Sequence, residues 1–151
     1  PVRGRMVRVS SEMFATTLDL YLLAGELPEA PDDMDTANGR PATQAAAMDR
    51  VARMLCADRT EIRDDEVLEL SQYWADRQCH QITSAAECVM QRQPTTCETA
   101  IVSGSGEFLA LRVLNEIGTL RFREIVSLGQ VFTPDIAEAA CAYAVACLHE
   151  A

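Results

Sequence analysis

The segment AIVSGSGEFLALRVL, residues 100–114, decides the fold that we predict for this chain. Its β-branched residues Ile101 and Val102 favour a short strand. From Glu107 onward, apolar residues recur at helical spacing, so we expect a helix to follow. A strand that leads through a short turn into a helix is typical of α/β proteins, and we expect a helix-rich member of that class.

The turn between this strand and helix consists of Gly104, Ser105 and Gly106. Glycine tolerates positive φ and close approach to the backbone. The helix that follows directs free N–H groups and its positive dipole end at the turn, so we name these three residues as candidate ligand-binding residues. The motif GxGxxG is incomplete here, and a tight turn that binds nothing is the alternative. Glu107 suits the helix dipole but would repel a phosphate beside it.

Composition limits the classes of partner. The chain has 151 residues, of which 48% are hydrophobic, enough for one domain with its own core. Its net charge of −10 repels phosphate backbones and anionic membranes, so we expect neither nucleic acid nor a membrane as partner. All 13 basic residues are arginine, which excludes a Schiff-base or P-loop lysine within the chain.

The cysteines do not form a metal-binding pattern. None of the six belongs to a C-x-x-C pair, so we expect no structural zinc site and assign no residue as a metal ligand. The sequence shows neither a signal peptide nor an apolar run of about 18 residues. We therefore expect a cytoplasmic protein with buried free thiols.

Capping residues and periodicity predict the remaining elements. We expect a strand at 2–9, helices at 11–24, 44–57 and 134–150, and a second strand at 120–125. The region 64–92 is expected to form one long helix or two helices joined near Gln78. Thr43 and Thr133 are the expected N-caps of the second and last helices, and Pro94 ends the third. We expect the last helix, which is rich in small residues, to pack tightly on a sheet. A sheet of two strands is unstable alone, so we expect a second copy of the chain or the rest of a larger α/β protein to supply further strands.

An acidic loop with three prolines is expected over 26–42. Its Asn38-Gly39 dipeptide favours positive φ at both residues. A loop of this length in a compact domain is often functional, and a solvated surface excursion is the alternative. Arg50 and Arg53 follow the loop and point away from the buried stripe of their helix, as surface residues or as an anion clamp.

Four segments together resemble one protein family. They are SSEMFATTLDLYLLAGELPE at 10–29, TANGRPAT at 36–43, RVARMLCAD at 50–58 and IVSGSGEFLALRVL at 101–114 with its preceding alanine. In this order they resemble the C-terminal part of the hydantoinase/oxoprolinase-like proteins linked to tetrahydromethanopterin one-carbon metabolism. The archaeal members of that family are synthases of methanofuran biosynthesis. The most specific motifs are FATT-x-D-x-Y and G-x-G-E-F-L-A.

The resemblance implies the ribonuclease-H-like fold of the sugar kinase/Hsp70/actin superfamily, in which two halves enclose a cleft. The N-terminal half of the family begins with an Asp-x-Gly-Gly phosphate loop, which this chain lacks. We therefore expect a single C-terminal domain or fragment over 1–151. It would consist of a helical insertion at about 11–97 and a strand-turn-helix core at about 99–151. The absent phosphate-binding half would come from a missing N-terminal segment or a partner chain, so the fragment alone should be inactive.

The resemblance also implies a reaction. A transferase of this kind joins an aminomethyl-furan diphosphate to a tyramine-type acceptor and releases diphosphate. The leaving diphosphate needs cations, which we expect to be Mg²⁺ and arginine, and the attacking phenol needs a base. Asp19 and Glu107, the carboxylates inside the family-like motifs, are the candidate catalytic residues. Asp19 would share a helix face with Glu12 and Thr16; a solvent-facing or backbone-bonded carboxylate is the alternative for Asp19, and a helix-dipole partner for Glu107.

The TANGR loop matches a T-x-Asp-Gly-Arg pattern of the family. It makes Asn38, Gly39 and Arg40 candidate ligand-binding residues, and Arg40, Arg50 and Arg53 candidate diphosphate contacts. The family has aspartate where this chain has Asn38, which keeps the turn but loses a charge. If that aspartate helps to hold a metal in the family, the chemistry of this protein differs from that of the family.

Two other functions are open. An ATP-dependent kinase or a hydantoinase-type hydrolase on the same fold would bind a nucleotide. A non-catalytic oligomerisation subunit would form a homodimer through the apolar stripe at 67–89 and bind no phosphate ligand.

Overall fold

The computed structural model describes residues 2, 4–92, 97–118 and 122–149. The chain divides into two compact units, Pro1–Gln78 and Cys79–Ala151. The elements in chain order are α1 (Thr17–Leu23), α2 (Gln44–Met54), α3 (Asp64–Gln91), β1 (Thr99–Val102), α4 (Glu107–Ile117), β2 (Glu124–Ser127), α5 (Leu128–Val131), α6 (Pro134–Glu138) and α7 (Ala140–His149). The helix-rich α/β class is confirmed, and in the described residues the sheet has two strands that run parallel.

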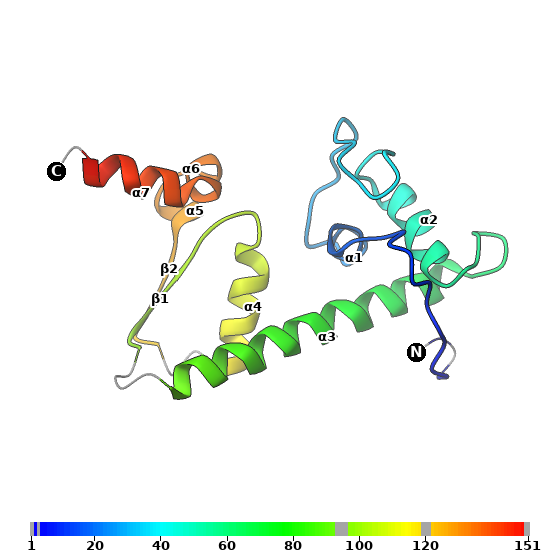
Figure 1. Cartoon of the computed structure of the whole chain (residues 1–151), viewed down its shortest axis with the longest axis horizontal. Helices are drawn as coiled ribbons and strands as arrows, with labels where there is room; N and C mark the ends of the chain where they lie inside the picture. The colour runs from blue at the N-terminus through cyan, green and yellow to red at the C-terminus, as the bar shows by residue number, and fades with distance from the viewer. Residues whose placement is uncertain (1, 3, 93–96, 119–121, 150–151) are drawn as a thin grey trace. The chain divides into compact units, whose positions relative to one another are not determined.

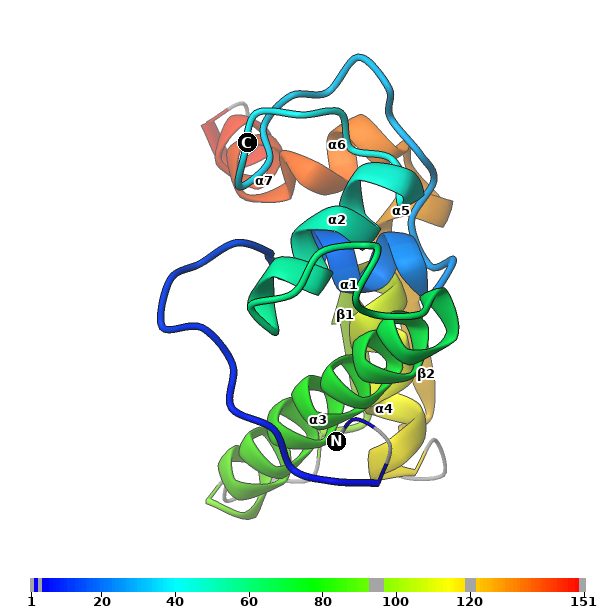
Figure 2. The same ribbon diagram turned by 90° about the vertical axis from the view of Figure 1, so that its right-hand side faces the viewer.

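In the first unit, α1 and α2 lie side by side (Figures 1 and 2). The alanine-rich α2 starts where the Thr43 hydroxyl accepts a hydrogen bond from the Ala46 N–H, as the capping pattern predicts. Both helices pack on the first half of α3. Their shared core contains Leu20, Val51, Ala52, Ile62, Val67 and Leu70.

The N-terminal part of the first unit is less regular than expected. The strand predicted at 2–9 is wrong, since only an isolated bridge joins Val2 and Arg5. The first helix begins at Thr17 rather than near residue 11, which leaves Glu12 outside it. The Ser10 hydroxyl accepts the Glu12 N–H at 3.0 Å, a local bond that competes with helix formation.

The second unit contains the strand-turn-helix that the glycine segment predicts. Strands β1 and β2 run parallel, with Thr99 opposite Glu124 and Val102 opposite Ser127, and α4 connects them. Figure 1 shows the two strands side by side. Apolar side chains of α4 pack against Cys79 at the start of this unit.

Several boundaries in the second unit differ from the prediction. The second strand lies at Glu124–Ser127, and residues 120 and 121 of the expected strand are outside the described residues. The last helix is divided at Ala139 into α6 and α7. Ala137 of α6 is buried, but no residue of α7 is, so the tight packing expected along the whole last helix is wrong for α7. Helix α3 is one continuous helix rather than two joined near Gln78. Pro94, its expected terminator, and Glu150, the expected end of the last helix, lie outside the described residues.

Two further observations concern the burial of the cysteines and the search for a membrane-spanning helix. Only Cys79 of the six free cysteines is buried, so the prediction of buried thiols is wrong for the other five. In the described residues, we find no helix with the length and apolar character that crossing a membrane requires.

Candidate functional site

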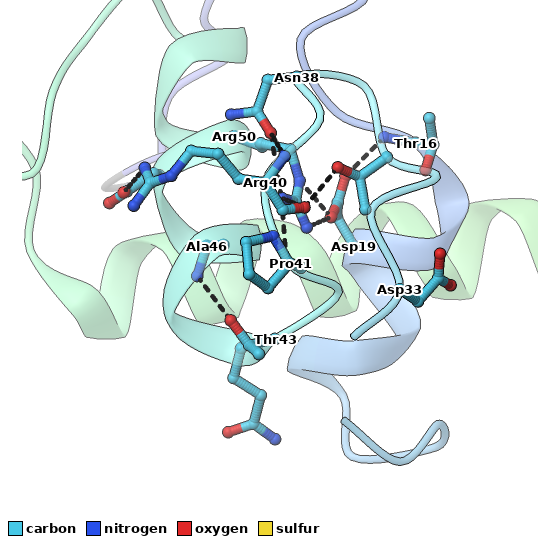
Figure 3. A network of polar contacts seen from close by, with 12 residues as sticks. Thr16, Asp19, Asp33, Asn38, Arg40, Pro41, Thr43, Ala46 and Arg50 are labelled. Carbon is cyan, nitrogen blue, oxygen red and sulfur yellow. Dashed lines mark hydrogen bonds and ion pairs between the residues drawn. The ribbon is translucent and has the colours of Figure 1, made fainter. Parts of the chain in front are cut away.

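The first candidate site is a buried ion pair between α1 and α2. Arg50 and Asp19 are both 0% exposed. The Arg50 Nε donates a hydrogen bond to Asp19 Oδ1 at 2.7 Å (Figure 3). Its Nη2 lies 2.6 Å from the same oxygen and completes the ion pair. The other oxygen, Oδ2, accepts the Thr16 N–H at 2.9 Å and thereby caps α1.

The guanidinium of Arg50 also organises the loop that precedes α2. Its Nη1 lies 3.3 Å from Asn38 Oδ1 and 3.4 Å from the carbonyl oxygens of Arg40 and Pro41 (Figure 3). Asn38 Oδ1 also accepts the Arg40 N–H at 3.2 Å. One amide oxygen thus serves both donors, so the turn does not need the negative charge of an aspartate. Gly39 has a φ of +65°, as expected, whereas Asn38 does not have positive φ.

The three candidate arginines differ in accessibility. The Arg40 side chain is 58% exposed and pairs with Asp49 at 2.7 Å. Arg53 is exposed and lines a cavity of about 420 Å³ with Asp58 and Glu61. Hydrogen bonds from the Thr60 hydroxyl and the Thr60 N–H lower the pKa of Asp58. Arg40 is therefore the candidate best placed to meet an anion from solvent, while Arg50 is used inside the fold.

The second candidate site lies at the carboxyl ends of β1 and β2. The Glu107 carboxylate accepts a hydrogen bond from the Ser127 hydroxyl at 2.5 Å and from the Gly129 N–H at 2.9 Å. A Cβ at Gly129 would lie 3.2 Å from Glu107 Oε2. Glu107 thus ties the start of α4 to the end of β2 and the start of α5. Neither partner residue was a sequence-based candidate, because the register of two distant strands brings them there.

The glycine turn opens at the same edge of the sheet. Gly104 has a φ of +93° and is half-buried, while Ser105 and Gly106 are exposed. In open α/β sheets, ligands bind outside the carboxyl ends of the strands. The charged side chain held at this edge is the carboxylate of Glu107, which disfavours a bare anion here.

The predicted site residues therefore form two groups, one in each unit. Asp19 joins Asn38, Gly39 and the Arg40 backbone around Arg50, whereas Glu107 adjoins the glycine turn. Sequence reasoning did not find the central place of Arg50. The signal was its spacing, because Arg50 lies three and four residues after the buried Ala47 and Ala46.

The described residues do not fit a magnesium site built by the protein alone. No group of three or more His, Cys, Asp or Glu side chains is placed to hold a metal ion in the ranges that the structure describes. Asp19 already engages Arg50 and Thr16. Glu107 is bonded to Ser127 and Gly129. We therefore derive no step through a metal.

Comparison with known proteins gives two relatives, while no family model matches the chain. Both relatives are named (4-{4-[2-(gamma-L-glutamylamino)ethyl]phenoxymethyl}furan-2-yl)methanamine synthase. The chain is thus similar to synthases of a furan methanamine. The protein of Methanocaldococcus jannaschii is 27% identical over 144 residues, which are 95% of this chain and 41% of that protein. That of Methanococcus vannielii is 24% identical over 146 residues, 97% of this chain and 65% of the relative.

The chain therefore spans less than two thirds of the length of either relative. The similarity supports the furan-methanamine synthase part of the expected resemblance. It does not test the relation to hydantoinases, oxoprolinases or sugar kinases.

Proposed function

We propose that this chain is part of a transferase of methanofuran biosynthesis that joins an aminomethyl-furan diphosphate to the phenol oxygen of a tyramine-type acceptor. The observation that supports this proposal is the extent of the similarity, which covers 95% of the chain and so includes both units. The names of both relatives describe a phenoxymethyl-furan, the ether that such a reaction forms.

The proposed reaction is a substitution at the furfuryl carbon. The phenol oxygen forms a bond to this carbon while the bond from the carbon to the diphosphate oxygen breaks. The electron pair of the broken bond leaves with diphosphate, and the phenol proton passes to a base. Because negative charge develops on the leaving group, a cation must meet it.

In this chain, we assign the leaving-group contact to Arg40. Its guanidinium is exposed, and its backbone is fixed by Asn38 and by the buried Arg50. Asp19 then acts as a positioning residue, because its carboxylate holds Arg50 rather than a ligand. Glu107 stays a candidate for the phenol base, and a nucleotide or Mg²⁺ stays a prediction from the resemblance.

We further propose that the chain is the C-terminal half of a ribonuclease-H-like fold. Among the described residues the parallel sheet has two strands, which supports this proposal, since such a sheet is unstable without more strands or covering helices. The phosphate-binding half would supply the rest of the sheet and of the site.

The test is ether formation by the full-length protein that contains this chain. It would be incubated with a furan-methyl diphosphate and tyramine, with and without ATP, and the ether measured by mass spectrometry. We expect ether and diphosphate in equal amounts without ATP. Substitution Arg40→Gln should slow the reaction about tenfold or more. The matched Arg63→Gln, which removes an exposed pair with Asp65 and a 3.7 Å contact with Glu66, should not. A reaction that requires ATP, or equal rates in the two variants, would contradict the proposal.

A further inference from the structure

A cleft of about 480 Å³ lies in the first unit. It is bounded by the segment before α1, by α1 itself, by the end of α2 and by α3. Its lining includes Met13, Thr16, Thr17, Leu20, Met54 and Trp74. This volume lies in the range of small-molecule sites, which are mostly apolar with a few polar groups.

The chemistry of the lining selects the ligand. Thioether and indole groups pack favourably against aromatic rings, and the cleft offers both in Met13, Met54 and Trp74. The two threonine hydroxyls can donate or accept one hydrogen bond each at a ring substituent. No charged residue is among the side chains that line it. The two other described cavities of this unit both contain arginine and glutamate.

The cleft adjoins the Asp19–Arg50 network. Thr16 lines the cleft, and its N–H donates to Asp19 Oδ2. Leu20 lines it one residue after Asp19. A ring in the cleft would therefore lie next to the polar network that fixes the loop of Arg40.

We propose that this cleft binds an uncharged phenol ring, and that in the proposed transferase it holds the acceptor. That assignment to the acceptor rests on the proposed function. The diphosphate-bearing furan is excluded from the cleft, because its charge would find no cation among the lining side chains. The phenol ring lies against Trp74 and the methionines, and its hydroxyl faces the threonines.

Trp74 makes the proposal directly measurable, because it is the single tryptophan of the chain. The probe is p-cresol, a neutral phenol, added to the chain while tryptophan is excited at the red edge of its absorption. We expect a saturable change in emission with p-cresol and none with cyclohexanol, which has a similar size but no aromatic ring. Absence of saturation with p-cresol, or equal responses to both compounds, would overturn the proposal.

Two methionine variants test the location. Met13 is 75% exposed and lines the cleft, whereas Met34 is 51% exposed and does not. Because both are largely exposed, an aspartate at either position should leave the fold intact, which circular dichroism can verify. Met13→Asp should weaken p-cresol binding about fivefold or more, and Met34→Asp should not change it. Equal affinities in the two variants would overturn the proposal.

The cleft and the proposed function can fail separately. If p-cresol binds in a Met13-dependent manner but the full-length protein forms no ether, the cleft is established and the transferase is wrong. If ether forms and Met13→Asp leaves the KM for the phenol unchanged, the transferase stands and the cleft assignment is wrong.

Discussion

At the scale of single residues, the buried pair of Asp19 and Arg50 is the most consequential feature. A buried charge is costly unless an opposite charge and hydrogen bonds compensate it. Arg50 receives that compensation from one carboxylate and from three oxygens of the loop at 38–41. The pair therefore couples the capping of α1 to the conformation of this loop.

Removing the charge of Asp19 should be strongly destabilising. Asp19→Asn leaves the Arg50 guanidinium buried without a counter-charge, so we expect the free energy of unfolding in urea to fall by about 3 to 5 kcal/mol. The control is Asp49→Asn, which weakens only partly exposed pairs with Arg40 and Arg59 and should cost less than about 1 kcal/mol. Similar losses of unfolding free energy in the two variants would show that the buried pair stabilises the fold no more than an exposed pair.

A second residue-scale prediction concerns Cys79 and alkaline pH. Burial, followed by the hydrogen bond and charge of Glu116, raises the pKa of the Cys79 thiol above its ordinary value of 9.0. As pH rises, the thiol ionises first in the unfolded chain, so its contribution to stability is complete below that value and is lost above it.

The measurement is urea unfolding at about pH 7 and about pH 10. Cys79→Ser, which does not titrate in this range, should lose less stability between the two pH values than the wild-type chain. The exposed Cys88→Ser is the control and should behave like wild type. An unchanged pH dependence in Cys79→Ser would contradict the expected shift.

The sequence identified Asp19 as chemically important but not its partner. The motif drew attention to the carboxylate, whereas Arg50 was expected to point away from the buried stripe, as a surface residue or as part of an anion clamp. Only the crossing of α1 and α2, whose two partners are 31 positions apart in the sequence, explains the burial. The positive φ of Gly39, in contrast, follows from local turn chemistry and was predictable.

At the scale of elements, Glu107 links two helix starts at one sheet edge. Replacing it with alanine removes hydrogen bonds to Ser127 and Gly129, so we expect a loss of about 2 kcal/mol in unfolding free energy. The Gly129 amide should also exchange its hydrogen faster, which NMR can follow. Glu98→Ala, at an exposed residue before β1, should change stability by no more than about 0.5 kcal/mol. Unchanged exchange at Gly129 would contradict the role of Glu107.

Elements with strong local signals were predictable, and those set by distant contacts were not. The caps and periodicity of α2 and α3, and the β-branched pair of β1, are local. Strand β2 lies a few residues later than expected, because its position depends on pairing with β1. The short α5 depends on Ser127, whose hydroxyl accepts the Gln130 N–H at 3.2 Å. Propensity alone does not reveal that cap.

At the scale of the whole molecule, the stripe at 67–89, through which a homodimer was predicted, is only partly available as a surface. Val67 and Leu70 are buried in the core of the first unit, so they are not available to a partner. Ile82 and Val89, farther along α3, are exposed. Both the homodimer partner and the absent phosphate-binding half stay predictions.

The central claim is that the protein of which this chain is part makes an aryl ether rather than hydrolysing a bond. The most direct test is to run the full-length protein with a furan-methyl diphosphate and tyramine in water enriched in heavy oxygen. Our account predicts an ether and diphosphate that both lack heavy oxygen, because the ether oxygen comes from the phenol. Furfuryl alcohol or phosphate that contains heavy oxygen, with no ether, would contradict it and identify a hydrolase.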